Sequence, residues 1–206
     1  MSLVKRGTVY GTLMNFRGEL DALGTQVNEP PYKAPPQAPV LYVKPANTWT
    51  ENGGTIRVPA GTEVEVGATV AMVMKSPREV EGYVLMNDLR LPQDSFFRPP
   101  VRFNALDGFL GIGDRIRARN EAGDPAVFKL EVRINGELKQ TVRFSQLVRP
   151  ADKLLADVSE FMTLGEGDML MLGCDVPRPR AKAGDRIDIS MPALGTLSNL
   201  LVAESA

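Results

Sequence analysis

The feature that most constrains the fold of this chain is an alternation of apolar and polar residues on both sides of an Asn-Gly pair. Residues 128–134 and 138–144 each place an apolar or uncharged side chain at every second position, which is the period of a half-buried strand. Asn135-Gly136 supplies the two residues with positive φ that a two-residue hairpin turn requires. The pattern therefore predicts a β-hairpin over residues 128–144.

Turn-forming residues divide the rest of the chain into short segments. The sequence contains 19 glycines and 16 prolines, which interrupt regular structure at frequent intervals. We expect a strand over Thr8–Asn15 and an extended, proline-rich segment over residues 29–39. Gly167-Asp168 and Gly184-Asp185 each predict a tight turn immediately before a strand.

Two short helices are expected in the C-terminal third. Ser145 is a candidate N-cap for a helix that begins at Gln146, and Pro150 fits the first turn of a second helix. The second helix would have an apolar stripe formed by Leu154, Leu155, Val158, Phe161 and Met162. Many strands, few helices and no alternation of strand with helix predict an α+β, predominantly β domain with mixed, rolled sheets.

Composition removes several classes of chemistry. The chain has no histidine and one cysteine, Cys174, which excludes histidine-based nucleophilic catalysis and zinc sites built on histidine or several thiolates. We expect Cys174 to be a buried small side chain rather than a nucleophile. A metal ion, where one bound, would be a hard cation on oxygen ligands.

Charge and hydropathy also limit the partners. The 24 basic and 25 acidic residues are interleaved, so the chain lacks the basic face that nucleic acids or anionic membranes require. No apolar run approaches the roughly 20 residues of a membrane span, and no signal-peptide core follows the N-terminus. We expect a cytoplasmic protein that binds neither nucleic acid nor membrane.

Short motifs occur in a fixed order over most of the chain. They are Gly82-Tyr83-Val84-Leu85-Met86-Asn87-Asp88, Asn135-Gly136-Glu137 with Gln140, residues 164–172, Gly184-Asp185, and Gly195 with Leu197, Asn199 and Val202. In this order they resemble the fumarylacetoacetate hydrolase family. The resemblance implies that family's fold as a single domain over residues 1–206, with an N-terminal arm and lid region at 1–50 and a β-rich core at 51–206.

Further stretches resemble one branch of the family, the isomerase/decarboxylases of 4-hydroxyphenylacetate (homoprotocatechuate) degradation. These stretches are residues 31–36, 44–48, 67–71 and 95–99. They are similar to the N-terminal half of such bifunctional proteins, whose two homologous halves are fused or separate. The resemblance implies a 2-hydroxyhepta-2,4-diene-1,7-dioate isomerase and 5-oxopent-3-ene-1,2,5-tricarboxylate decarboxylase activity for the assembled pair.

The family's chemistry, as the resemblance implies it, uses Mg²⁺ or Mn²⁺ held by one Asp and by two Glu that lie two residues apart on a strand. The ion binds a 2-oxo acid and stabilises the enolate. Alignment of the apolar run before Lys75 places the two Glu at Val66 and Ala68, and the Asp at Asp88. Glu63 and Glu65 are offset from that pair by three residues, so we expect them to be solvated on the opposite strand face. The alternation of residues 64–74 agrees with this expectation, since it predicts one apolar face formed by Val64, Val66, Ala68, Val70, Met72 and Met74.

Other family positions are also changed. The family's lid motif aligns with Asn15-Phe16-Arg17-Gly18-Glu19, where Glu19 replaces its His and Ala22 its Glu. Asn104 replaces the usual Lys, Pro92 an Arg, and Gly173-Cys174-Asp175 a Gly-Thr-Pro. We therefore expect no catalytic residue and no metal bound by this chain, and expect Asp88 to accept backbone N–H bonds. The residues expected to line a vestigial substrate pocket are Asn15, Arg17, Asp88 and Gln140.

Three functions remain open. The first is a structural partner for a homologous catalytic subunit, or for a second copy in a dimer, where the catalytic subunit holds Mg²⁺ or Mn²⁺ and acts on a small 2-oxo or dienoate dicarboxylic acid. The second is an independent hydrolase or isomerase of a 2-oxo acid. The third is a non-enzymatic ligand-binding module. Candidate residues for the independent enzyme are Asp88, Lys75, Arg17 and Cys174.

Overall fold

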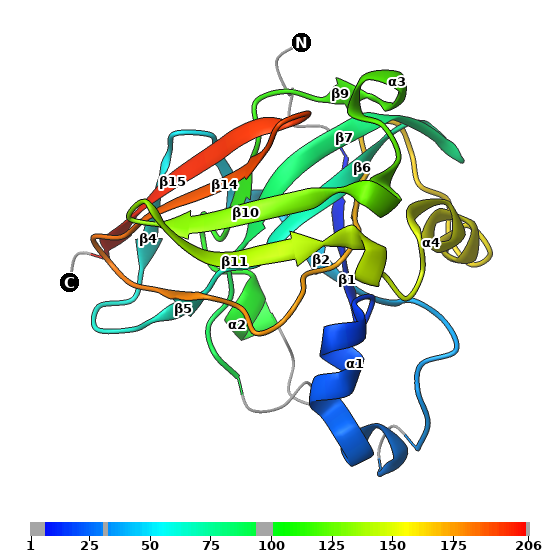
Figure 1. Cartoon of the computed structure of the whole chain (residues 1–206), viewed down its shortest axis with the longest axis horizontal. Helices are drawn as coiled ribbons and strands as arrows, with labels where there is room; N and C mark the ends of the chain where they lie inside the picture. The colour runs from blue at the N-terminus through cyan, green and yellow to red at the C-terminus, as the bar shows by residue number, and fades with distance from the viewer. Residues whose placement is uncertain (1–6, 31–32, 94–100, 205–206) are drawn as a thin grey trace.

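The computed structural model describes residues 7–30, 33–93 and 101–204, in which two curled sheets pack face to face (Figure 1). The larger sheet has the order β2-β1-β12-β6-β7-β8-β3, with β9 also paired to β7. Its strands are β1 (Val9–Leu13), β2 (Val40–Lys44), β3 (Trp49–Glu51), β6 (Ala68–Ser76), β7 (Glu79–Asp88), β8 (Leu110–Ile112), β9 (Arg117–Ala118) and β12 (Met169–Met171). Parallel and antiparallel pairs both occur, so the predicted mixed sheets are confirmed.

The second sheet has the order β11-β10-β14-β15-β4. Its strands are β4 (Thr55–Val58), β10 (Lys129–Ile134), β11 (Glu137–Arg143), β14 (Arg186–Met191) and β15 (Gly195–Ala203). A small ladder pairs β5 (Val64–Glu65) with β13 (Arg180–Ala181) beside it. The short helices are α1 (Arg17–Leu23), α2 (Val101–Asn104), α3 (Arg119–Ala122), α4 (Ala151–Val158), η1 (Gly24–Asn28), η2 (Ala46–Thr48), η3 (Pro125–Val127) and η4 (Phe144–Gln146).

The predicted hairpin is confirmed as β10 and β11. Asn135 and Gly136 have φ values of 52° and 83°, the positive values that the turn demands. The turns at Gly167 and Gly184 also have positive φ and precede β12 and β14 as predicted.

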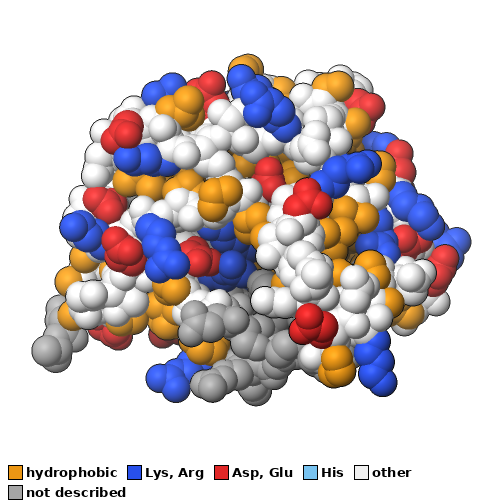
Figure 2. Space-filling model, turned by 60° about the horizontal axis from the view of Figure 1, so that its bottom comes forward, with side chains coloured by type: hydrophobic (Ala, Val, Ile, Leu, Met, Phe, Trp, Pro, Cys, Tyr) orange, Lys and Arg blue, Asp and Glu red, His pale blue; other side chains and the backbone are white. Residues whose placement is uncertain are grey.

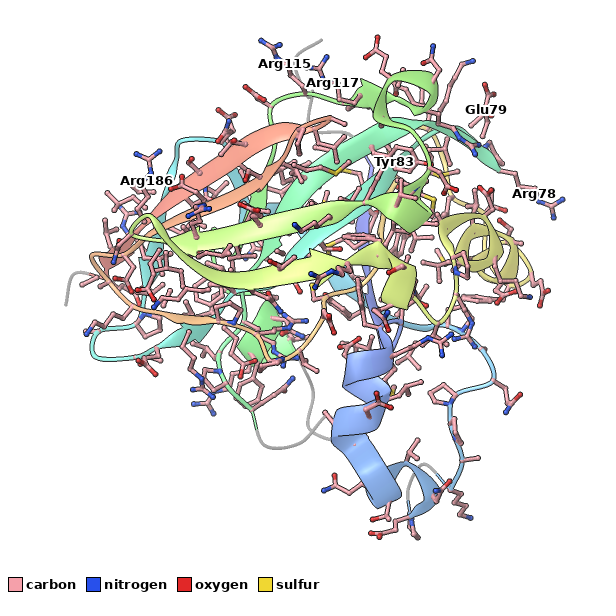
Figure 3. The ribbon with its side chains drawn as sticks, in the orientation of Figure 1. Arg78, Glu79, Tyr83, Arg115, Arg117 and Arg186 are labelled. Carbon is pink, nitrogen blue, oxygen red and sulfur yellow. The ribbon has the colours of Figure 1, made fainter. Side chains whose placement is uncertain are left out.

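The main core lies between the two sheets. Tyr83 of β7 packs edge-on against Phe128, and Phe128 contacts Phe144, which in turn packs edge-on against Phe16. Figure 3 shows Tyr83 on the side of β7 that faces the second sheet, whereas the labelled Arg115 and Arg117 lie at the rim of the molecule. The aromatic series therefore links the N-terminal segment to both sheets.

A second apolar cluster covers the other face of the larger sheet. Its buried members are Val9, Tyr42, Trp49, Ala71, Val73, Val84, Met86, Leu110, Ile112, Met169 and Met171. Because both faces of β6 and β7 are buried, these strands are the most enclosed part of the sheet. Asp88 stands at the end of β7, so this enclosed strand pair positions the candidate site.

The helix predictions are confirmed only in part. α4 follows Pro150 and buries Leu154, Leu155 and Val158. Phe161 lies beyond the end of α4 and is 57% exposed, so its place in the stripe was wrong. The helix predicted to begin at Gln146 is also wrong, because a 3₁₀ turn ends there and Leu147 pairs with Phe16.

The N-terminal region contributes directly to the larger sheet. β1 matches the strand predicted over Thr8–Asn15, and β2 lies beside it at the sheet edge. The described part of residues 29–39 contains no helix or strand, as the prolines predicted, and residues 31–32 lie outside the described part. No helix within the described ranges is long and apolar enough to cross a membrane.

Candidate functional site

Asp88 is the centre of a buried charge cluster. Its side chain is 3% exposed, and its Oδ1 lies 2.9 Å from Nζ of Lys44, whose side chain is fully buried. The Nζ donates hydrogen bonds to the carbonyl oxygens of Leu89, Asn104 and Phe109 at 2.6–2.9 Å. Burial lowers the pKa of Lys44, and the Asp88 carboxylate opposes that shift. Three carbonyl acceptors for its three protons, together with the carboxylate, fit the charged ammonium form.

The second oxygen of Asp88 has three partners. Tyr42 donates its hydroxyl to Oδ2 at 2.6 Å, and Nη1 of Arg178 lies 3.3 Å away. The thiol of Cys174 is 3.8 Å from the same oxygen. Asp88 was expected to accept backbone N–H bonds, and this expectation was wrong, since side chains supply these contacts.

The charges set the protonation of these groups. Burial alone raises the pKa of Asp88, but Lys44 and Arg178, with the Tyr42 hydrogen bond, outweigh burial and hold the pKa below its ordinary value. Burial raises the pKa of the Cys174 thiol to about 12, so it is protonated at neutral pH. The prediction that Cys174 is a buried, unreactive side chain agrees with this environment.

The register of the strands decides which positions lie beside Asp88. Gly67 and Asp88 exchange backbone hydrogen bonds, and Thr69 is paired with Met86. Directly opposed residues of an antiparallel pair project to the same face. Gly67 and Thr69 therefore lie on the face of Asp88, and neither supplies a carboxylate.

This register corrects the sequence alignment by one residue. Val66 and Ala68, taken as the positions of the family's two glutamates, point into the main core on the opposite face. The apolar face predicted for residues 64–74 is confirmed, but Asp88 lies on the other face, with Glu65 and Thr69. A shift of one residue exchanges the two faces of a strand, so the reason given for rejecting Glu65 was wrong.

The surroundings of Glu65 give a different reason. Its Oε2 lies 2.6 Å from Nε of Arg90, and its Oε1 lies 3.4 Å from Nη2 of Arg180. Its side chain is 14% exposed, so the expectation that it is solvated was also wrong, whereas Glu63 is exposed as expected. Arginine partners occupy both of its carboxylate oxygens.

These residues do not fit a hard divalent cation of the kind that the sequence resemblance implies. Such an ion needs several oxygen ligands, but Asp88 is bound by two protein cations. The residues that share its face on the adjacent, paired segment are Gly67 and Thr69. A side chain added at Gly67 would place its Cβ 2.5 Å from the Asp88 carbonyl oxygen and 2.7 Å from Arg178. Within the described ranges no three His, Cys, Asp or Glu side chains gather as a metal site.

Glu19 lies at the edge of this cluster on α1. It is 7% exposed, and its Oε2 has no hydrogen-bond partner in the described structure. Burial raises its pKa to about 7, although Arg178 and Arg90 oppose the shift. The helix α1 thus presents a carboxyl group that changes its charge near neutral pH.

The other residues predicted for the pocket have different roles. Asn15 bonds to Leu172 and Arg149, and Gln140 donates to the carbonyls of Asp175 and Pro177. Both side chains hold the segment that carries Cys174 and Arg178. The side chain of Arg17 is exposed and has no hydrogen bond or ion pair within the described structure.

Sequence reasoning missed Lys44, Tyr42 and Arg178 as partners of Asp88. Tyr42 and Lys44 lie two residues apart on β2 and are both buried, a period-two pattern that the sequence contains. Arg178 lies on a segment without regular structure, about 90 residues from Asp88 in the chain. No local pattern indicates this contact, which the strand order of the larger sheet creates.

A family model matches almost the whole chain. The fumarylacetoacetate (FAA) hydrolase C-terminal domain matches residues 8–202. The 4-hydroxyphenylacetate degradation bifunctional isomerase/decarboxylase of Salmonella dublin is 34% identical over 209 residues, covering 97% of this chain and 48% of that protein. The chain therefore spans about half the length of this curated relative.

Solved structures show the same fold. The 2-hydroxyhepta-2,4-diene-1,7-dioate isomerase of Mycobacterium marinum has a TM-score of 0.82 and 23% identity, covering 100% of this chain and 78% of that one. A fumarylpyruvate hydrolase of Pseudomonas aeruginosa, solved with Mn²⁺ and pyruvate, has a TM-score of 0.79 and 20% identity, covering 96% and 90%.

Replacement of Lys44 tests the buried ion pair. Lys44→Met leaves Asp88 with one fewer cation and three carbonyls without their donor, so we expect a loss of about 3–5 kcal/mol in the free energy of unfolding. Urea denaturation measures this loss. Lys75→Met is the matched control, because Lys75 pairs with Glu79 on the surface; equal unfolding midpoints for the two variants would contradict the assignment.

Gly11 tests how the sheet positions Tyr42. A Cβ at Gly11 would lie 2.0 Å from Cζ of the Tyr42 ring. Gly11→Ala should displace the ring from Asp88 and reduce stability by about 1–3 kcal/mol. Gly165→Ala is the matched control, because a Cβ at Gly165 would lie 3.6 Å from its nearest atom. This variant should have the same urea midpoint of unfolding as the wild type. A wild-type midpoint for Gly11→Ala would show that the ring does not need this glycine.

Glu19 should make stability depend on pH. Its pKa is raised from 4.5 to about 7 in the folded state, so its contribution is complete below pH 4.5 and is lost as pH rises through about 7. The difference corresponds to about 3 kcal/mol. Urea denaturation measures this effect. Between pH 5 and pH 8, the free energy of unfolding of the wild type, taken relative to that of Glu19→Gln, should fall by about this amount. A constant difference between the two proteins would refute the raised pKa.

Proposed function

The chain belongs to the fumarylacetoacetate hydrolase family, and we propose that it is the half of an isomerase/decarboxylase that does not hold the catalytic metal. The proposed pair acts in 4-hydroxyphenylacetate catabolism on 2-oxo or dienoate dicarboxylic acids. Support comes from the Salmonella dublin relative, which is a bifunctional isomerase/decarboxylase of that degradation and about twice the matched length.

The observation that carries the proposal is the state of Asp88. Its Oδ1 faces Lys44 at 2.9 Å, and its Oδ2 accepts from Tyr42 and Arg178 at 2.6 and 3.3 Å. A divalent ion would have to displace at least one of two buried cations, which would then lose its counter-charge. The neighbouring strand positions, Gly67 and Thr69, offer no carboxylate in compensation.

In the proposed pair, this chain would contribute the fold of the family and a homologous subunit would contribute the chemistry. Mg²⁺ or Mn²⁺ in that subunit would supply the Lewis acid for enolate formation. Lys44 and Arg178 of this chain would neutralise its own carboxylate, Asp88, in place of a metal ion. A second copy of this chain is the simpler partner, but two such copies would bring no metal-binding carboxylates.

An independent enzyme is less well supported by its candidate residues. Lys75 is exposed and paired with Glu79, and Arg17 is exposed. Cys174 lacks an activating base, and its pKa of about 12 leaves it protonated. Asp88 is held ionised by its cations, which weakens it as a base because a low pKa reduces the affinity for a proton.

Turnover by separate and combined subunits tests the proposal. The chain alone, supplied with Mg²⁺ or Mn²⁺, should not convert 2-hydroxyhepta-2,4-diene-1,7-dioate or 5-oxopent-3-ene-1,2,5-tricarboxylate above the uncatalysed rate. A homologous subunit that holds the metal should be active, and its complex with this chain should form on size exclusion. Absorbance of the diene reports the reaction.

Matched variants identify the subunit that catalyses the reaction. Removal of the metal-binding carboxylates from the homologous subunit should abolish turnover by the complex. Metal-dependent turnover by this chain alone, lost in Asp88→Ala but retained in the surface variant Glu79→Ala, would refute the proposal. Failure of the two subunits to associate would refute the partner role.

A further inference from the structure

Apart from Oδ1 of Asp88, which has Lys44 as its ion-pair partner, two polar atoms beside the Asp88 cluster have no hydrogen-bond partner in the described structure. They are Oε2 of Glu19 and Nε of Arg178, and both atoms are buried. The residues are only 7% and 8% exposed, so bulk water does not solvate them freely. A buried donor and a buried acceptor without partners are costly and indicate a missing third group.

The geometry of Arg178 indicates the charge of that group. Nη1 makes its two bonds with the carbonyl and carboxylate of Asp88. Nε lies on a different edge of the planar guanidinium, the edge that arginine commonly presents to a carboxylate. This edge therefore remains available to an acceptor after the ion pair with Asp88 has formed.

The charge balance of the cluster points to the same conclusion. Lys44 and Arg178 share one carboxylate, Asp88, while Arg90 is paired with Glu65. When Glu19 is protonated, Asp88 is the one carboxylate among the described residues that faces both Lys44 and Arg178. Buried charges are normally paired, so the cluster is suited to one additional anion.

We propose that a small monocarboxylate anion binds without a metal between the Nε edge of Arg178 and the carboxyl group of Glu19. Its carboxylate would accept from Arg178, and protonated Glu19 would donate to it. Figure 2 shows basic and acidic side chains recessed in a hollow at the end of the molecule that is turned forward there. This arrangement would give the chain a binding activity that needs no divalent cation.

Binding should be linked to a proton on Glu19. The groups that face Glu19 are Arg178, Arg90 and Cys174, and Asp175 lies against Gly18 of the same helix. An ionised Glu19 would repel the incoming carboxylate, whereas the protonated form donates a hydrogen bond. With a pKa of about 7, affinity should fall about tenfold between pH 6 and pH 8.

Nuclear magnetic resonance can observe this site directly. Sodium acetate is titrated into ¹⁵N-labelled protein in EDTA, with sodium chloride at equal ionic strength as the reference. The Nε–Hε resonance of Arg178 should shift saturably with acetate at pH 6, and the dissociation constant should be about tenfold larger at pH 8. Absence of a saturable shift up to about 100 mM acetate, or the same shift with chloride, would overturn the proposal.

Matched variants separate the proposed contacts from general charge effects. Arg178→Lys keeps a cation beside Asp88 but removes the planar edge, so acetate binding should weaken at least tenfold. Arg180→Gln alters a half-exposed arginine on the same segment and should bind acetate as wild type does. Binding to Arg178→Lys that equals wild type would show that acetate lies elsewhere.

Glu19→Gln tests the linked proton and remains informative when Arg178→Lys is unstable. The amide can donate a hydrogen bond at every pH, so this variant should bind acetate equally at pH 6 and pH 8. A pH dependence unchanged from wild type would overturn the role of Glu19. Because EDTA removes divalent cations, these results are independent of whether the chain turns over substrate with a metal.

Discussion

The ion pair between Lys44 and Asp88 is the interaction on which the rest of the site depends. It joins β2, at the edge of the larger sheet, to the end of β7 near its centre. The same ammonium group binds three carbonyl oxygens, from the residue after β7, the last residue of α2 and the residue before β8. A single buried side chain therefore fixes the backbone around the carboxylate, and Arg178 and Tyr42 complete its neutralisation.

Under the proposed function, this arrangement would allow the fold of the family to be kept without a metal-binding ligand set. The strand pair β6–β7 brings a glycine and a threonine to the face of Asp88, and the segment after β12 places Cys174 and Arg178 over Gly67. The guanidinium of Arg178 then occupies the space that a side chain at position 67 would need, and it supplies positive charge beside the carboxylate. The fold similarity to a solved structure that contains Mn²⁺ is thus compatible with a different set of side chains at this centre.

Much of the fold followed from local patterns in the sequence. The Asn135-Gly136 turn, the alternation along residues 64–74 and the glycine turns before β12 and β14 were all predicted correctly. Local patterns were less informative for the site. The alternation shows that a strand has two faces, but it does not show which face meets Asp88, and an alignment error of one residue exchanged them.

Long-range contacts account for the remaining errors. Arg178 reaches Asp88 only because β12 lies between β1 and β6, and Glu65 is enclosed by Arg90 and Arg180 from two other segments. Likewise, the pKa of Glu19 depends on the burial of its side chain beneath α1. The sequence of this seven-residue helix does not show which of its side chains is buried. Such groups are positioned by tertiary structure rather than by local propensity.

The most direct test of the central claim is a ¹³C titration of the Asp88 carboxyl group, with and without Mg²⁺. The account predicts a pKa below the ordinary 3.8 in EDTA and a carboxyl resonance that Mg²⁺ does not shift, because protein cations already neutralise this group. A pKa at or above the ordinary value, or a saturable shift with Mg²⁺, would contradict it.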